Sequence, residues 1–113
     1  MTYSPETDTL TPGFSFTELQ DYVRDMEADR GFAHEDATRK ALLLAEEVGE
    51  ALKAVRKLTG GATDSEWTPN DLGEELADIL IVTATLANRF DIDLEAAIRH
   101  KEAINRKRLW EYE

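Results

Sequence analysis

The sequence contains no cysteine among its 113 residues. Disulfides and thiolate metal sites are therefore excluded, and any metal ion would be a hard cation held by oxygen ligands. Basic residues are also scarce, since 13 Lys and Arg stand against 24 Asp and Glu and give a formal charge of −11. That balance argues against broad contact with nucleic acid or with an anionic membrane, because both require a basic surface. A small phosphorylated ligand held through metal ions is still allowed.

Long apolar runs are missing as well, so no segment is long enough to span a bilayer. The opening MTYSPETDTLTPG has neither a basic start nor an apolar stretch, so we expect no signal peptide and a cytoplasmic protein. A chain of this length is expected to form one domain with a modest core, which association with further copies would help to stabilise. We place a flexible arm at residues 1–14 and the domain at residues 15–113.

Helix signals dominate the rest of the chain, and no segment alternates with the period of two that is typical of a strand. Ser15 and Glu18 have the spacing of a capping box, and Thr68-Pro69 is a typical helix start. Thr59-Gly60-Gly61 is a typical helix end. The sequence predicts helices over about 15–28, 35–58, 68–89 and 93–109. The predicted fold is therefore an all-α, four-helix bundle-like subunit.

Acidic side chains interrupt the apolar faces of both middle helices. At about 100° per residue, Glu47 falls inside the apolar face of the second helix and Glu75 inside that of the third. Glu50 and Asp78 lie three residues further on, one turn along at the margins of these faces. Four converging carboxylates would repel one another, whereas Mg²⁺ would neutralise them and leave room for substrate phosphates. An ordinary solvated face is the alternative, and spacing alone leaves both interpretations open.

A basic stripe follows on the fourth predicted helix. Lys101, Asn105 and Arg108 recur at spacings of four and three residues and therefore share one side of a helix. The stripe overlaps the side of Leu94 and Ile98, so we expect it to face inward. Its charges would there meet the carboxylates of the middle helices, or phosphates bound over the metal ions. A structural ion-pair network without a ligand explains the spacing equally well.

Taken together, these residues resemble the MazG-like all-α nucleoside triphosphate pyrophosphohydrolases. The family motif EExxE is matched by EEVGE at 46–50, ExxD is matched by ELAD at 75–78, and the trailing K-x3-N-x2-R element is matched by the basic stripe. The likeness covers roughly residues 16–110. It implies an enzyme that hydrolyses nucleoside triphosphates between the α and β phosphates, giving the monophosphate and pyrophosphate.

The resemblance also implies roles for individual side chains. Glu46 would orient or deprotonate the attacking water, while the basic stripe would contact phosphate or sugar. Independently of the resemblance, Trp110 follows the basic stripe and is therefore a candidate for stacking on the base. Phe32 and Trp67 are further candidates for stacking, although ordinary packing is the simpler explanation for all three aromatic residues. The implied ligands of Mg²⁺, or alternatively of Mn²⁺, are Glu47, Glu50, Glu75 and Asp78.

The third predicted helix is apolar nearly all round, which is typical of a central helix. In so small a chain it would need cover from another subunit, and the resemblance also implies dimers or tetramers. We predict a homo-oligomer, with a tetramer favoured over a dimer. The expected role is house-cleaning of the (deoxy)nucleoside triphosphate pool. The alternatives are a phosphoribosyl-ATP pyrophosphohydrolase and a non-catalytic helical interaction module. A di-iron carboxylate protein is disfavoured because neither histidine, His34 or His100, completes an ExxH pair.

Overall fold

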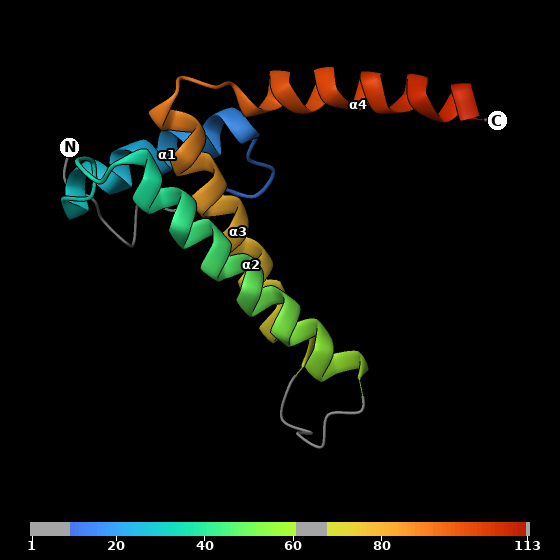
Figure 1. The fold of residues 1–113 in the computed structure, drawn as a ribbon. Helices are drawn as coiled ribbons and strands as arrows, with labels where there is room; N and C mark the ends of the chain where they lie inside the picture. The colour runs from blue at the N-terminus through green and yellow to red at the C-terminus, as the bar shows by residue number, and fades with distance from the viewer. Residues whose placement is uncertain (1–9, 61–67, 113) are drawn as a thin grey trace.

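The computed structural model describes residues 10–60 and 68–112, with side chains described as far as residue 108. Within these ranges the backbone forms four α-helices and no strand (Figure 1). The helices are α1 (Phe16–Arg30), α2 (Ala37–Thr59), α3 (Pro69–Arg89) and α4 (Leu94–Tyr112). The all-α prediction is confirmed, and each helix lies close to the range that the sequence predicts.

Side-chain hydrogen bonds fix where the first two helices begin. The Ser15 hydroxyl accepts from the backbone N–H of Glu18 at 3.1 Å, and the Glu18 carboxylate accepts from the N–H of Ser15 at 3.2 Å. At the start of α2, the Asp36 carboxylate accepts from the N–H of Arg39 at 2.8 Å. Gly31 ends α1 in the left-handed conformation, with φ of 80°. These residues provide partners for backbone groups that a helix end leaves unpaired.

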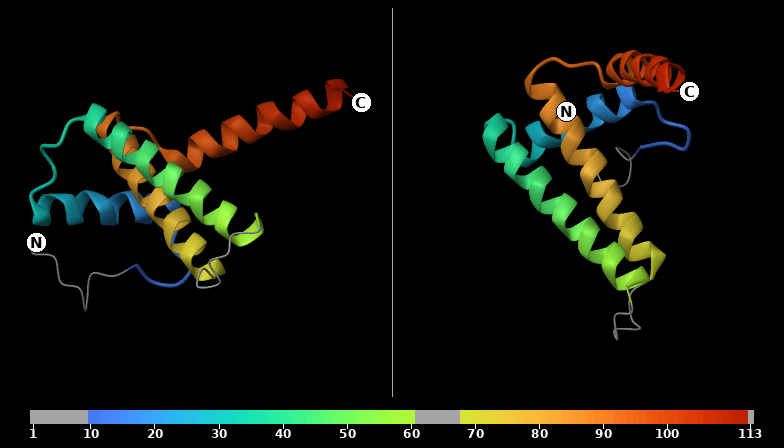
Figure 2. Two further views of the ribbon diagram at one scale, coloured as in Figure 1. Left: turned by 60° about the horizontal axis from the view of Figure 1, so that its bottom comes forward. Right: turned by 45° about the vertical axis from the view of Figure 1, so that its right-hand side comes forward.

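Helix α3 is the central element of the described chain, since it packs beside α2 and also crosses α1 (Figures 1 and 2). Val23 of α1 and Ala84 of α3 are completely buried and form a small core with Leu19. Leu10 packs against this core from inside the predicted arm. The division of the chain at residue 14 itself stays a prediction. Further alanines of α2 and α3 are buried: Ala51, Ala54 and Ala87.

Helix α4 projects away from the other three helices (Figures 1 and 2), and its main contact is with α1. The radius of gyration is 17.0 Å, whereas a compact domain of about 100 residues has a radius of about 13 Å. Ile98 was expected to face inward but is exposed in the single chain. The expectation that this side of the fourth helix faces inward is therefore wrong for Ile98 in the single chain. The connection after α3 contains Asp91 at φ 53°, a turn that the sequence pattern does not reveal.

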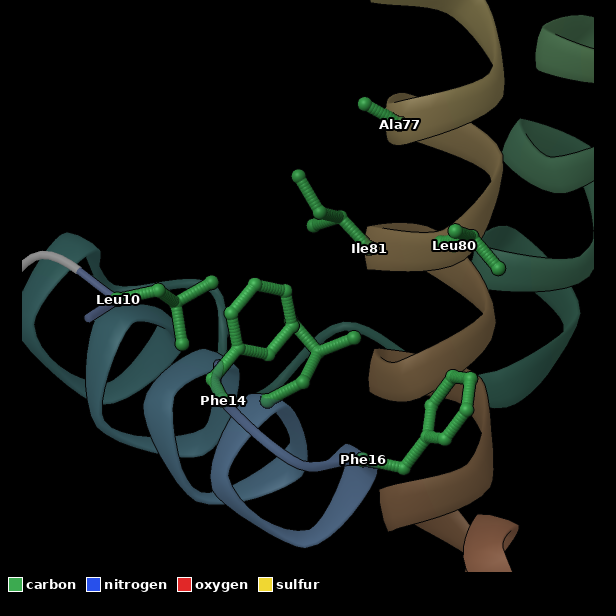
Figure 3. Close-up of a pocket in the computed structure, with 7 residues that line it drawn as sticks. Leu10, Phe14, Phe16, Ala77, Leu80 and Ile81 are labelled. Carbon is green, nitrogen blue, oxygen red and sulfur yellow. The ribbon is translucent and has the colours of Figure 1, made fainter. Parts of the chain in front are cut away.

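Several apolar side chains remain uncovered. An apolar hollow of about 320 Å³ lies between the segment leading into α1 and the middle of α3 (Figure 3). Leu80 borders this hollow and is 50% exposed, and Leu52 of α2 is 64% exposed. Exposed apolar side chains that form a contiguous patch are typical of interaction surfaces. The hollow is lined by Leu10, Phe14, Phe16, Leu19, Ala77, Leu80 and Ile81. In the described ranges no helix is both long and apolar enough to cross a membrane.

Candidate metal centre

Three of the four predicted metal ligands come together where α2 and α3 run side by side. Glu47 of α2 and Glu75 and Asp78 of α3 each offer a carboxylate oxygen, and these three oxygens lie within 4.8 Å of one another. Glu47 and Glu75 are half-buried, while Asp78 is exposed and faces solvent. The helical periodicity that placed Glu47 and Glu75 on the inner faces thus identified two side chains that the structure brings together, and their role as metal ligands stays a prediction. We refer to these three side chains as the carboxylate cluster.

The electrostatics of the carboxylate cluster show a conflict among its charges. Partial burial, the negative charges of Asp78 and Glu75, a hydrogen bond with Glu75 and the nearby Glu46 all raise the pKa of Glu47 above its ordinary value. These surroundings shift Glu47 toward the protonated form relative to a free carboxyl, because ionisation adds a further negative charge to the group. A bound cation would reverse this preference by neutralising the acids together.

The donor set of the carboxylate cluster suits a hard divalent cation. All three donors are carboxylate oxygens, which Mg²⁺ and Mn²⁺ accept, and the described residues contribute neither thiolate nor imidazole to the group. The exposed position of Asp78 leaves one side open to water and to a ligand. Glu50, the fourth predicted ligand, is exposed one turn further along α2 and does not belong to the group. Its role as a ligand stays a prediction.

Glu46, the predicted water-orienting residue, is exposed beside the carboxylate cluster. Its charge contributes to the raised pKa of Glu47, which places it within electrostatic reach of that carboxyl. Glu46 also borders a groove of about 450 Å³ along the first half of α2. We call this the α2 groove. Its walls are both polar and apolar, and they are formed by Phe32, Glu35, Arg39, Lys40, Leu42, Leu43 and Glu46.

A buried ion pair behind the α2 groove was not predicted. The Arg89 guanidinium donates to both carboxylate oxygens of Glu27, at 2.8 and 2.7 Å, and the Lys40 ammonium lies 3.2 Å from the same carboxylate. Glu27 is only 3% exposed. Burial by itself raises the pKa of Glu27, but hydrogen bonds and charge attraction from Arg89 and Lys40 outweigh it and hold the pKa below its ordinary value. The carboxylate is therefore ionised in the folded chain.

Arg89 also reaches the wall of the α2 groove. Its guanidinium donates to the backbone carbonyls of Glu35, at 2.9 Å, and Phe32, at 3.1 Å. The segment between α1 and α2 is thus fixed from the end of α3. The sequence does contain a signal for the burial of Glu27, because Glu27 continues the helical spacing of Leu19 and Val23. The periodicity argument that identified Glu47 would have identified Glu27 as well.

The predicted substrate-binding stripe lies on α4, away from the carboxylate cluster and the α2 groove. Lys101 and Arg108 are exposed and Asn105 is half-buried. Because α4 projects from the molecule (Figure 1), a single chain does not bring the stripe to the carboxylate cluster. The side chain of Trp110 lies outside the described side chains, and Trp67 lies outside the described residues altogether.

The fold and the carboxylate cluster define an all-helical protein with an acidic centre shared by two packed helices. A model of the MazG nucleotide pyrophosphohydrolase domain matches residues 27–108, and the chain belongs to this family. The resemblance drawn from the sequence motifs is thereby confirmed. Among curated proteins, the chain is similar to human dCTP pyrophosphatase 1, with 37% identity over 113 aligned positions. The alignment covers 89% of this chain and 66% of the human protein, slightly less than two thirds of its length.

Proposed function

We propose that the chain is a divalent-metal-dependent nucleoside triphosphate pyrophosphohydrolase. The reaction would hydrolyse the bond between the α and β phosphates, releasing a nucleoside monophosphate and pyrophosphate. The observation that carries the proposal is the carboxylate cluster, in which two helices of a MazG domain bring three oxygen donors within 4.8 Å of one another. Mg²⁺ is the proposed ion, with Mn²⁺ as a functional substitute.

Each acidic residue has a proposed part in this chemistry. Glu47, Glu75 and Asp78 hold the metal, and Glu50 extends the set from the next turn of α2. When bound, the divalent ion neutralises charge on the phosphate oxygens and lowers the pKa of coordinated water. Glu46 borders both the carboxylate cluster and the α2 groove, which supports its proposed role of accepting a proton from an attacking water.

The basic stripe enters through a second copy of the chain. Triphosphate needs cationic partners, and the proposed ones, Lys101 and Arg108, are exposed on a helix that projects away from its own carboxylate cluster (Figure 2). We propose that α4 of one subunit lies over the cluster of another, with Asn105 completing the phosphate or sugar contacts. The uncovered apolar side chains of α2 and α3, such as Leu52 and Leu80, support such an assembly. A dimer or a tetramer meets this requirement, and the tetramer remains our preferred state.

The α2 groove is the proposed place for the nucleobase. It lies beside Glu46, and the ring of Phe32 on its wall offers a stacking surface. The printed name of the human relative identifies dCTP as the substrate of that protein. We therefore propose dCTP as the first substrate to be tested, and house-cleaning of the deoxynucleotide pool in the cytoplasm as the role. Trp110 is a further proposed base contact.

A panel of ribonucleoside and deoxyribonucleoside triphosphates with Mg²⁺ tests the activity. We expect equal amounts of monophosphate and pyrophosphate, identified by ion-exchange chromatography, and no product after chelation of the metal. Phosphoribosyl-ATP belongs in the same panel, because hydrolysis of that compound alone would replace the proposed substrate class. Release of orthophosphate would redirect the proposal to another bond. No hydrolysis at all, with no stabilisation by Mg²⁺, would leave the chain as a helical interaction module.

A further inference from the structure

One buried amide links α1 to the start of α4. Gln20 is 7% exposed, and its Nε2 group donates to the backbone carbonyl of Ile92 at 2.7 Å and to Oδ1 of Asn88 at 3.0 Å. Its Oε1 accepts from the backbone N–H of Leu94 at 3.0 Å. Asn88 in turn donates from Nδ2 to the backbone carbonyl of Gln20 at 2.9 Å. We call this set of four hydrogen bonds the Gln20 clamp.

The backbone fixes the orientation of the Gln20 amide. The Ile92 carbonyl can only accept and the Leu94 N–H can only donate, so the nitrogen and oxygen of the side chain cannot be exchanged. Leu94 is the first residue of α4, where the N–H has no partner inside the helix. The amide therefore supplies the α3–α4 connection with one donor and one acceptor that are matched to its geometry.

The Gln20 clamp is placed to control the direction of α4. That helix projects from the molecule, and α1 makes its main contact with the rest of the chain (Figure 1). Leu94 is half-buried against the core, whereas Glu95, Ala96 and Ala97 just beyond it are exposed. Little packing beyond the first turn thus holds α4 in place. The direction of the helix therefore depends on the hydrogen bonds at its first turn.

We propose that Gln20 is a positioning residue that aims the Lys101, Asn105 and Arg108 stripe. This inference rests on the proposed function, because the stripe matters for catalysis only if it contacts the substrate. Gln20 itself touches neither metal nor phosphate. It acts through α4, by holding the helix at the angle at which the stripe reaches the carboxylate cluster of a second subunit.

A distance measurement tests the clamp without any substrate. Cysteines introduced at Lys53 of α2 and Arg106 of α4, both exposed, would be the only ones in a chain that has none. Spin labels at these sites, diluted with unlabelled subunits, report the distance within one chain. We expect a narrow distance distribution that broadens or shifts in Gln20→Glu, whose second carboxylate oxygen faces the Ile92 carbonyl without a proton to donate. The control Thr17→Ala, one turn earlier on α1 and exposed, should leave the distribution unchanged.

Kinetics separate positioning from general destabilisation. Gln20→Glu should raise the KM for the triphosphate about tenfold, as expected when one hydrogen bond to a charged group is lost. The affinity of the carboxylate cluster for Mn²⁺, measured by calorimetry, should stay unchanged, because the hydrogen bonds of the Gln20 side chain go to the end of α3 and to the start of α4. If Gln20→Glu weakened both triphosphate binding and Mn²⁺ binding, the role of Gln20 would be merely structural. If Gln20→Glu does not fold, Gln20→Ala removes the clamp without adding a charge.

An unchanged distance distribution in a folded Gln20 variant would overturn the inference. If the unmodified chain hydrolyses no triphosphate, the proposed function fails, but the distance measurement still decides whether Gln20 aims α4.

Discussion

At the residue scale, the two adjacent glutamates of the EEVGE segment show how neighbouring positions on a helix acquire different surroundings. Glu46 is exposed beside the α2 groove, whereas Glu47 is half-buried in the carboxylate cluster with a raised pKa. A rotation of about 100° between neighbouring positions separates a solvent-facing acid from an inward-facing one. The same division recurs on α3, where Glu74 is exposed and Glu75 joins the cluster.

The α3 pair offers a matched test of the metal site. Glu75→Gln should lower kcat/KM at least about 100-fold, because the loss of groups that merely support metal ligands already costs 10–100-fold. Its apo form should melt at the same temperature or higher, since one of the repelling acids is gone. Glu74→Gln removes the same charge one position earlier and should leave the activity near that of the unmodified chain. Equal losses in both variants would contradict the assignment, and kinetics with melting curves in the presence and absence of Mg²⁺ distinguish the outcomes.

Glu27 makes a prediction about pH. Its pKa in the folded chain lies below the ordinary value of 4.5. The unfolded chain therefore binds more protons than the folded chain around that pH, and the stabilisation is fully present above about 4.5 and is lost as the pH falls toward the folded pKa. Glu27→Gln should lower the free energy of unfolding by about 3 kcal/mol at pH 7, because Arg89 and Lys40 lose their buried counter-charge.

Urea unfolding between pH 7 and pH 3 checks this expectation. The difference between the unmodified chain and Glu27→Gln should shrink as the solution becomes acidic. Asp25→Asn, an exposed carboxylate on the same helix, should show a small difference at every pH. A gap that stays constant down to pH 3 would mean that ionisation of Glu27 does not contribute to stability.

At the element scale, most helix ends could be predicted from the sequence because local groups determine them. Ser15, Asp36 and Asp93 each accept a hydrogen bond from a backbone N–H three residues later, and such caps depend only on nearby residues. The direction of α4 could not be predicted in this way. Gln20 and its partners at the base of α4 are separated by 68 to 74 residues in the sequence, so no local pattern reveals the contact.

The carboxylate cluster lies between these two cases. Helical periodicity placed Glu47 and Glu75 on inner faces, and the neighbouring position of α2 and α3 brought them together. The same reasoning could not place the basic stripe, because a helical wheel shows which residues share a face but not which element covers that face. Periodicity could have placed Glu27 on an inner face, but it could not identify Arg89, 62 residues further along, as the cation that meets it there.

Two glycines test the helix-end argument. Gly31→Ala should lower the free energy of unfolding by about 1 kcal/mol, because the added Cβ is strained at φ of 80° although nothing lies within 4 Å of it. Gly73→Ala, inside α3 and with the same open space, should raise it by about 0.5–1 kcal/mol. Chemical denaturation of both variants measures the contrast. If both substitutions changed the free energy of unfolding in the same direction, backbone conformation would not determine the effect of adding a Cβ.

At the scale of the whole molecule, the projecting α4 predicts a shared active site. Glu75→Gln and Arg108→Ala should each be inactive alone, the first without metal binding and the second without its phosphate contact. Co-refolded in equal amounts, they should recover about a quarter of the unmodified activity, because half of the pairs are mixed and each mixed pair has one intact site.

Sedimentation provides the control for that experiment. The unmodified chain should sediment as a dimer or tetramer at micromolar concentration, and both variants should retain the same mass. If the subunits exchange but the mixture of the two variants has no activity, the stripe lies over the carboxylate cluster of its own chain. A monomeric mass for the unmodified chain would remove the basis for the shared site.

Helix α3 carries two of the clustered acids in its first half. Near its end it carries the arginine that tethers the α1–α2 segment and the asparagine that meets Gln20. All of these side chains belong to one continuous helix. If α3 slipped by a single position against its neighbours, every one of those side chains would swing by about 100° together. Such a register error would displace all of these side chains at once, so the correct register of α3 is an all-or-nothing condition for the proposed catalysis.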